Sequence, residues 1–386
     1  MYGSNGVSDD AERTAFRRAE KKYKVYYDDS KSSKKYLTVL FLFLFDCCWF
    51  LFCYSVLENF RKKQLKQVDL SEVVDFKAIL RSFNQSGEVP PGTFALQCDF
   101  DRPVFCIENR PGFYFIPDAL TVEEQGRWIR ESLISFPQPY NRTNHNAIYG
   151  PLRDLFMAAK ERKILVEEED SSGGLDSLSN SSITNMDAER WKFYEENTVS
   201  SRGSTCKSIS ASVLLRKLRW STLGLQFDWS KRNYNVSLPH NKIPDALCDL
   251  AKEMAAPAMS KGKVFQPEAA IVNYFGLGDM LGGHLDDMEA DWTKPIVSMS
   301  LGCKAIFLLG GKSRDDPPLA MFVRSGDVVL MAGEARECFH GVPRIFTDQE
   351  NAEIAPLELM FSHEDDVCFL EYIRSSRINI NIRQVF

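Results

Sequence analysis

The heptapeptide Arg377-Ile-Asn-Ile-Asn-Ile-Arg383, near the end of the 386-residue chain, alternates polar and branched apolar residues without a break. A period of two is that of a β-strand, in which successive side chains point to opposite faces. The isoleucines then share one face, and the arginines and asparagines share the other. Four polar side chains on an inward face would be costly unless an anionic ligand satisfied them, whereas on an outward face they would meet water. We favour the inward placement.

The residues upstream of this heptapeptide also form short β-prone runs separated by Gly, Pro and Asp turns, one of them Ser325-Gly-Asp327. This spacing is typical of a double-sheet jelly roll of the cupin type. We therefore predict a mainly β fold with flanking helices, whose core over residues 266–386 is a double-stranded β-helix (jelly roll). The expected strands span residues 269–275, 296–309, 319–323, 328–332 and 378–385.

Three residues of this core could hold a metal ion: His284, Asp286 and, later in the chain, His340. Residues two apart in an extended segment point to the same side, so one short strand can offer both His284 and Asp286. We expect His340 on a strand across the barrel. Two neutral imidazoles and one carboxylate bind one face of a ferrous ion and leave other positions open, as in non-haem iron oxygenases. H-x-D alone has little specificity, so its combination with His340 and the two arginines carries the prediction.

The preceding region, residues 111–265, is predicted to begin with a β-prone aromatic run and a helix. The run is Gly112-Phe-Tyr-Phe-Ile-Pro117, and Thr121-Val-Glu-Glu124 is a capping box that opens the helix. Residues 166–186 are acidic and then rich in Ser, Gly and Asn, which is typical of a solvated linker.

Between residues 214 and 234, cations alternate with large aromatic residues. Aromatic faces can stack nucleic acid bases while Arg and Lys hold phosphates, so this stretch is the best candidate for a nucleic acid surface. The alternative is a pair of strands with a packed aromatic side and a solvated cationic side. The candidate contacts are Arg216, Lys217, Arg219, Trp220, Trp229, Lys231 and Arg232.

The N-terminal part has three sections: a polar, charged tail (residues 1–35), an apolar segment (36–60) and an extension (61–110) with a short amphipathic helix expected at 68–81. The run Tyr36 to Leu57 is long enough to cross a bilayer. A charge such as Asp46 within a span costs about 2.5–3.5 kcal/mol. A translated intron is therefore an alternative to a genuine anchor, and a buried core helix is a third reading.

Composition sets wider bounds. The formal net charge of −6 argues against a chain that coats nucleic acid non-specifically, although a local basic face is compatible with it. The ten cysteines form no C-x-x-C pair, which favours free thiols in a reducing compartment over a structural zinc site. We expect a monomer in the cytoplasm, nucleus or mitochondrion, with membrane attachment only if residues 36–57 are a genuine anchor.

Taken together, the motifs resemble the AlkB-like Fe(II)/2-oxoglutarate-dependent dioxygenases and, among them, the first AlkB-homologue subfamily of eukaryotes. The resemblance spans residues 111–385. It rests on Pro111-Gly-Phe-Tyr-Phe-Ile-Pro117, Leu218-Arg-Trp-Ser-Thr-Leu-Gly224, Asn273-Tyr-Phe275, Leu281-Gly-Gly-His-Leu-Asp286, Ala305-Ile-Phe-Leu-Leu-Gly-Gly311, Ser325-Gly-Asp327 and the R-x-N-x-x-x-R ending.

The resemblance implies roles for individual residues. The family usually has tyrosine where this chain has Phe275, so a phenol hydroxyl that would touch 2-oxoglutarate is missing. Tyr274 cannot replace it, because adjacent side chains of a strand face opposite ways. We expect weaker cosubstrate affinity and the same reaction class. The implied iron ligands are His284, Asp286 and His340; the implied cosubstrate contacts are Arg377 on the distal carboxylate, Asn273, Asn379, position 275, and Arg383 beside the substrate pocket.

The implied activity is Fe(II)- and 2-oxoglutarate-dependent oxidative demethylation of nucleic acid bases, which consumes O2 and releases succinate, CO2 and formaldehyde. A methyl group on a paired base is inaccessible, so the base must be single-stranded or flipped out. N1-methyladenine in tRNA is the favoured substrate; N6-methyladenine in DNA and oxidation of 5-methylcytosine in RNA are the others that the subfamily suggests. Two alternatives stay open: a dioxygenase acting on histone or other protein side chains, and a catalytically weak nucleic-acid-binding module.

Overall fold

The computed structural model describes residues 13–25, 68–168, 190–199, 207–228, 231, 233–347 and 350–386. The apolar segment 36–57, residues 169–186 of the expected linker, Trp229 and Arg232 lie outside these ranges. Within them, no helix is long and apolar enough to span a bilayer.

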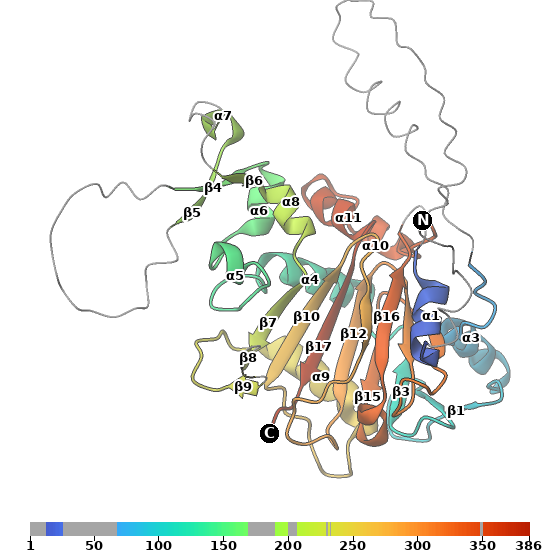
Figure 1. The fold of residues 1–386 in the computed structure, drawn as a ribbon. Coiled ribbons are helices and arrows are strands. Elements are labelled where there is room, and N and C mark those ends of the chain that lie inside the picture. The colour runs from blue at the N-terminus through green and yellow to red at the C-terminus, as the bar shows by residue number, and fades with distance from the viewer. Residues whose placement is uncertain are drawn as a thin grey trace, which may run out of the picture.

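Two antiparallel sheets face each other and form the predicted jelly roll (Figure 1). The larger has eight strands in the order β1-β2-β3-β15-β12-β17-β10-β7, and the smaller has four in the order β11-β16-β13-β14. The bounds are β1 Thr93–Ala95, β2 Phe105–Ile107, β3 Phe113–Ile116, β7 Trp220–Gly224, β10 Ala269–Phe275, β11 Leu281–His284, β12 Ile296–Gly302, β13 Ala305–Leu309, β14 Leu319–Val323, β15 Val328–Met331, β16 His340–Ile345 and β17 Arg377–Arg383. Four strands of the larger sheet, β1, β2, β3 and β7, come before residue 266, where the predicted core begins.

The outer face of the larger sheet packs against helices. Thr121 and Glu124 form the predicted capping box at the start of the first of them. Ile378, Ile380 and Ile382 are fully buried in this layer, so the apolar face of β17 is the one turned toward the helices. The helices are α4 (Val122–Ile134), α9 (Asp245–Ala255), α10 (Ala355–Met360) and α11 (Val367–Ile373).

The space between the two sheets is filled at one end and hollow at the other. Aromatic and aliphatic side chains such as Phe113, Phe115 and Met321 fill the end near β3 and β14, and α3 (Phe76–Ser86) closes it. The other end is a cavity of about 550 Å³ that meets the polar face of β17. The inward placement of the arginines and asparagines is therefore confirmed.

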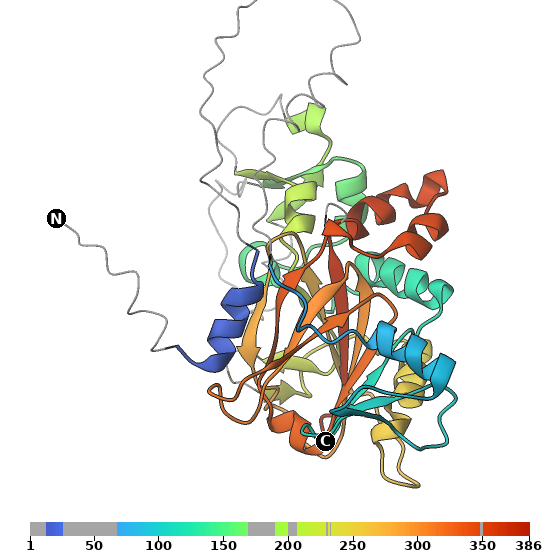
Figure 2. The same cartoon turned by 90° about the vertical axis from the view of Figure 1, so that its right-hand side faces the viewer.

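Two N-terminal helices pack on different sides of this β core (Figure 2). Helix α1 (Ala15–Tyr23) buries Phe16 and Tyr23 against the outer face of the smaller sheet. The helix predicted over 68–81 begins only at Phe76, because the side chain of Asp75 accepts the N–H groups of Lys77 and Ala78 and so caps it. The prediction placed its start too early.

A smaller layer lies beside the edge of the larger sheet that ends in β7 (Figure 1). It contains the three-stranded sheet β5-β4-β6 and the hairpin of β8 and β9. Two residues of the expected linker, Val166 and Glu167, belong to strand β4. The bounds are α5 Asn146–Tyr149, α6 Leu155–Lys160, β4 Ile164–Glu167, β5 Trp191–Tyr194, α7 Glu196–Val199, β6 Ser208–Ser210, α8 Ala211–Arg216, β8 Gln226–Asp228 and β9 Asn233–Asn235.

Candidate metal and cosubstrate site

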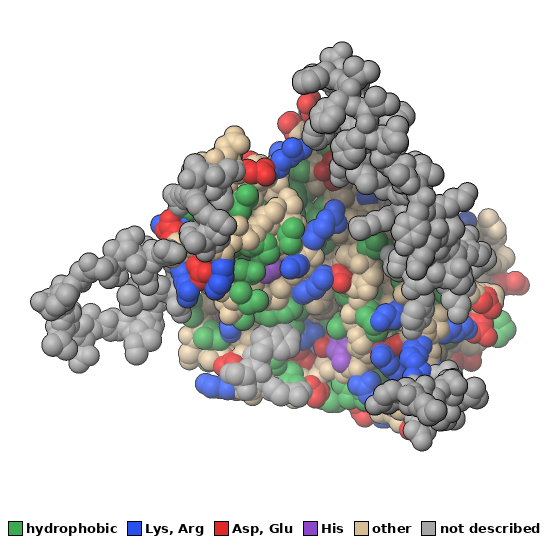
Figure 3. Space-filling view, turned by 45° about the horizontal axis from the view of Figure 1, so that its top comes forward, with side chains coloured by type: hydrophobic (Ala, Val, Ile, Leu, Met, Phe, Trp, Pro, Cys, Tyr) green, Lys and Arg blue, Asp and Glu red, His purple; other side chains and the backbone are tan. Residues whose placement is uncertain are grey.

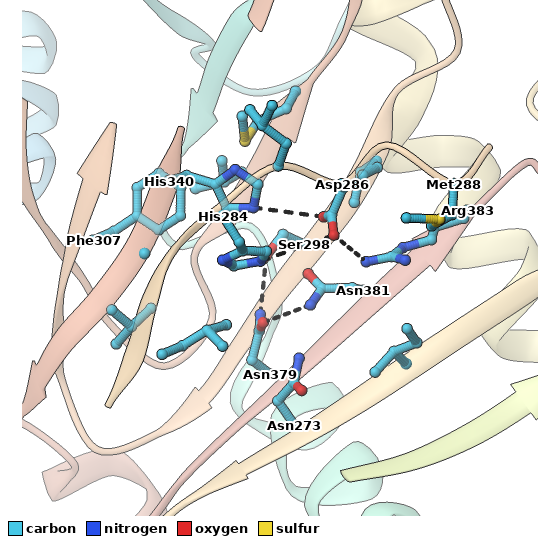
Figure 4. A pocket seen from close by; sticks show the side chains of 18 of the residues that line it. Asn273, His284, Asp286, Met288, Ser298, Phe307, His340, Asn379, Asn381 and Arg383 are labelled. Carbon is cyan, nitrogen blue, oxygen red and sulfur yellow. Dashed lines mark hydrogen bonds and ion pairs between the residues drawn. The ribbon is translucent and has the colours of Figure 1, made fainter. Parts of the chain in front are cut away.

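The candidate metal ligands meet at the hollow end of the core (Figure 4). His284 is the last residue of β11 and lies opposite His340, the first residue of β16. Asp286 follows just beyond the strand, and the potential ligand atoms of the three residues lie within 4.8 Å of one another. Contrary to expectation, His340 comes from the neighbouring strand of the same sheet and not from across the barrel.

Hydrogen bonds orient both imidazoles. Nδ1 of His284 lies 2.9 Å from the carbonyl of Gly282, and Nδ1 of His340 lies 3.3 Å from that of Cys338. A carbonyl can only accept, so each Nδ1 carries the proton and each Nε2 keeps a lone pair. The Nε2 atoms lie 3.9 Å and 3.5 Å from the Asp286 carboxylate. Three donor atoms therefore converge on one point.

The protonation states suit a divalent cation. Burial and the neighbouring His340 lower the pKa of His284 to about 4. Burial alone would raise the pKa of Asp286, but Arg383 and the two histidines hold it well below its ordinary value. A neutral imidazole and an ionised carboxylate at neutral pH are the forms that bind a metal ion.

Arg377 lines the same cavity and is 2% exposed. Its Nη2 donates to the hydroxyl of Ser300 at 2.8 Å, while its Nε and Nη1 have no hydrogen-bond partner among the described residues. Burial lowers its pKa to about 10, which still leaves the guanidinium charged at neutral pH. A buried cation with unpartnered N–H groups is matched by a carboxylate ligand in the cavity. The residues therefore fit a metal ion with an anionic cosubstrate.

The predicted asparagines also line the cavity, with Asn273 opposite Asn379 in the register of β10 and β17. The amide of Asn379 donates to Ser298 Oγ at 2.9 Å and to the carbonyl of Met299 at 3.0 Å. Its own oxygen accepts from Asn381 at 2.9 Å. Asn379 is thus held by three hydrogen bonds, whereas the side chain of Asn273 makes no hydrogen bond to the other described residues.

Phe275 packs beside Arg377 and is buried in the filled end of the core. Its ring centre lies 5.4 Å from the guanidinium carbon of Arg377. Tyr274 points to the opposite face, where its hydroxyl donates to the carbonyl of Ser132 at 2.6 Å and accepts from Ser221. The expectation that Tyr274 cannot supply the missing hydroxyl is confirmed.

Arg383 lines the cavity, but its guanidinium is already paired. Its nitrogens lie 3.0 Å from Asp286 Oδ1, 3.1 Å from Glu289 Oε1 and 3.2 Å from the hydroxyl of Tyr234. The structure places Arg383 with the carboxylate of a candidate metal ligand, whereas Arg377 contacts only the hydroxyl of Ser300 among the described polar side chains.

The sequence did not point to several polar residues around the site. Each acts through a contact with a residue far away in the chain, which leaves no local spacing signal. Glu289, for example, contacts Arg336 across 47 positions. The residues missed are Tyr234, Glu289, Ser298, Ser300 and Arg336.

The candidate nucleic acid contacts differ in their exposure to solvent and in their ion-pair partners. Arg216, Lys217 and Arg219 are exposed, and Arg219 pairs with Asp279. Trp220 is half-buried and lies opposite Asn273 across β7 and β10, on the cavity side of the sheet. Lys and Arg side chains lie on the face of the molecule that also shows histidine (Figure 3). Lys231 is exposed as well.

Comparisons with known proteins agree with this geometry. A family model described as 2OG-Fe(II) oxygenase superfamily matches residues 176–383. The chain is 64% identical to the DNA N(6)-methyladenine demethylase ALKBH1A of Arabidopsis thaliana over 100% of both chains. It is 31% identical to the nucleic acid dioxygenase ALKBH1 of Homo sapiens, over 72% of this chain and 65% of that one. It is 29% identical to the tRNA demethylase abh1 of Schizosaccharomyces pombe, over 73% and 82%. The chain is therefore a dioxygenase of the 2OG-Fe(II) oxygenase superfamily and belongs to its AlkB-like ALKBH1 subfamily.

Proposed function

We propose that this enzyme demethylates N-methylated adenine in nucleic acid, with Fe(II) held by His284, Asp286 and His340 and with the distal carboxylate of 2-oxoglutarate held by Arg377. The observation that carries the proposal is the pair of unpartnered nitrogens on buried Arg377, in the same cavity as three converging metal donors. A cavity that offers a metal position and an anion position together suits a dicarboxylate that spans both.

Fe(II) with 2-oxoglutarate and O2 supplies the oxidising chemistry that converts an N-methyl group to an N-hydroxymethyl group. The protein's part is to position and to exclude water. Ser300 and Phe275 fix the guanidinium of Arg377, and Ile271 and Val342 line the cavity with apolar surface. The hydroxymethylated base then loses formaldehyde.

The substrate base reaches the site single-stranded or flipped out, because a paired methyl group is shielded. Phe227 is 5% exposed and lines the cavity, so an aromatic face is available to stack on an entering base. Exposed Arg216, Lys217, Arg219 and Lys231 are the candidate phosphate contacts. Two relatives' names suggest the nucleic acids to compare: DNA that contains N6-methyladenine, and methylated tRNA.

The test loads the enzyme anaerobically with Fe(II) and 2-oxoglutarate, admits air, and measures succinate and formaldehyde. The substrates are oligonucleotides with N6-methyladenine in single-stranded DNA, N1-methyladenine in a tRNA stem-loop or 5-methylcytosine in RNA, and a methylated histone peptide. We expect formaldehyde with a methyladenine oligonucleotide and neither product with His284→Ala. Formaldehyde from the peptide alone would support the protein-directed alternative and overturn the nucleic acid substrate.

A further inference from the structure

A buried ion pair lies directly behind the candidate metal site. The carboxylate of Glu289 is completely shielded from solvent and lies 2.6 Å from Nη2 of Arg336, which is 1% exposed. Burying two charges costs several kcal/mol per ion before their attraction repays it, and an apolar pair of similar volume is often as stable. Stability alone therefore gives no reason for a carboxylate at this position.

Arg336 also donates hydrogen bonds to the loop that carries Asp286. Its Nη2 also donates to the backbone carbonyl of Asp286 at 2.9 Å, and its Nη1 donates to that of Lys294 at 3.1 Å. The two acceptors lie near the two ends of the loop that joins β11 to β12. The buried side chain of Arg336 thus fixes the backbone of Asp286, whose carboxylate is a candidate metal ligand.

Glu289 connects the same ion pair to the side chain of Asp286. Its Oε1 accepts from Nη1 of Arg383 at 3.1 Å, and Nη2 of Arg383 lies 3.0 Å from Asp286 Oδ1. Two arginines and two carboxylates therefore balance in charge within one cluster. Because Glu289 shares the charge of Arg383, the pull of that cation on Asp286 is smaller than it would be in an isolated pair.

Tyr234 adds the β8–β9 hairpin to the cluster. Its hydroxyl donates to Glu289 Oε1 at 3.1 Å and accepts from Nη1 of Arg383 at 3.2 Å. Burial raises the pKa of this hydroxyl to about 12, so it stays protonated and keeps its donor role at neutral pH. The hairpin also brings Phe227 to the cavity, and the rings of Phe227 and Tyr234 are 5.3 Å apart.

We propose that Tyr234 and Glu289 are positioning residues that hold Arg383, and through it Asp286, in the arrangement that binds the metal ion. The β8–β9 hairpin is then a structural part of the metal site and not only a wall of the substrate entrance. The inference rests on the proposed ligand set of His284, Asp286 and His340.

The test measures binding of Mn(II) alone to the metal-free full-length enzyme by electron paramagnetic resonance, without 2-oxoglutarate or nucleic acid. Tyr234→Phe keeps the ring and removes two hydrogen bonds. We expect its Kd for Mn(II) to rise about tenfold, the lower end of the effect typical of residues that orient metal ligands. Glu289→Gln should weaken binding in the same direction, because Arg383 then competes with the metal for Asp286 with its full charge.

The matched control is Tyr274→Phe, which also removes two hydrogen bonds from a buried hydroxyl, on the opposite face of the larger sheet. We expect the two tyrosine variants to lose similar thermal stability and only Tyr234→Phe to lose Mn(II) affinity. Equal Mn(II) affinity in wild type and Tyr234→Phe would overturn the inference and leave the ligand set standing. If the wild type itself failed to bind Mn(II), the ligand set and the inference would fall together, and this is independent of any demethylation assay.

Discussion

A guanidinium group is costly to bury unless its charge and its N–H groups find partners. Arg377 and Arg383 lie on one face of one strand, six residues apart, yet they differ in this respect. Arg383 is paired with two carboxylates, whereas Arg377 has a single hydroxyl partner. This difference supports the proposal that Arg383 maintains the site and that Arg377 binds the carboxylate of a ligand.

Replacing Arg377 by lysine keeps a cation and removes the planar fork. Each charge-assisted hydrogen bond contributes about 1.5–3 kcal/mol, so we expect the Kd for 2-oxoglutarate to rise about 10- to 100-fold. Isothermal titration of the Mn(II)-loaded protein measures this. The control is Arg374→Lys, at an exposed arginine paired with Glu358, which should leave the Kd unchanged. Equal affinity in both variants would contradict the clamp assignment.

Phe275→Tyr restores the hydroxyl that the family usually has at this position. The ring already lies beside Arg377, so we expect tighter binding of 2-oxoglutarate, by about 2- to 10-fold for one hydrogen bond of about 0.5–1.5 kcal/mol. The same titration measures the change. Phe275→Leu, which adds no donor, serves as the control. Weaker binding by Phe275→Tyr would show that the buried site does not accommodate the hydroxyl.

Asp327 gives the metal-free protein a pH-dependent stability. Burial raises its pKa to about 7, although it accepts backbone N–H groups from Asp118 and Arg324. The folded state then holds a proton that the unfolded state, with its ordinary pKa, has already released. This contribution to stability is therefore present at low pH and is lost as the pH rises through about 7.

The Asp327→Asn variant has no carboxyl group to titrate at this position. We therefore expect it not to show the loss of stability that deprotonation of Asp327 causes. Denaturant unfolding of both proteins at pH 5 and pH 8 provides the measurement. The free energy of unfolding of the variant, relative to that of wild type, should therefore increase from pH 5 to pH 8. A difference that stays constant with pH would count against a raised pKa.

At the scale of elements, helix α1 supports the strand that carries His284. Glu20 accepts the N–H of Gly283 at 2.6 Å, and the ring of Phe16 lies over Gly283 without exposure to solvent. A Cβ atom at Gly283 would come within 2.4 Å of that ring, whereas one at Gly282 would meet nothing closer than 3.6 Å. Strand β11 and helix α1 can pack this closely only because the residue is glycine.

Gly283→Ala should therefore displace α1 and destabilise the protein by about 1–3 kcal/mol, the usual cost of overpacking. Thermal unfolding compares it with Gly282→Ala, for which we expect a much smaller change. A double-mutant cycle with Phe16→Ala gives the second readout, because the space left by the ring should accept the new methyl group. If the two substitutions had additive effects on stability, the contact with Phe16 would not be the cause of the destabilisation by Gly283→Ala.

At the scale of the whole molecule, the proposed nucleic acid surface spans more than one element. Reversing the charges of Arg216, Lys217 and Arg219 to glutamate should weaken turnover on oligonucleotides and reduce its salt dependence, because phosphate contacts release counterions. Succinate formed without nucleic acid should not change. The control reverses exposed Lys242, Lys261 and Lys263, which adjoin α9. Equal effects of both triple variants would refute a localised surface.

The sequence allowed a good prediction of β17 and of the residues around it, because alternation in one strand is a local property. The faces of Arg377 to Arg383 and the convergence of His284, Asp286 and His340 followed from it and from the family resemblance. The start of α3 was wrong because capping by Asp75 overrides the apolar pattern. The placement of His340, the strands recruited from residues 93–116, and the pairing of Glu289 with Arg336 depend on contacts between distant segments, which leave no spacing signal.

The depth of the half-hollow core has a kinetic consequence. Arg377 is 2% exposed, whereas Asp287, which lines the same cavity, is exposed. A cosubstrate held by Arg377 would therefore lie deeper in the cavity than a base beside Asp287. We therefore expect ordered binding, with 2-oxoglutarate first and succinate the last product to leave, so that succinate should compete with the next 2-oxoglutarate.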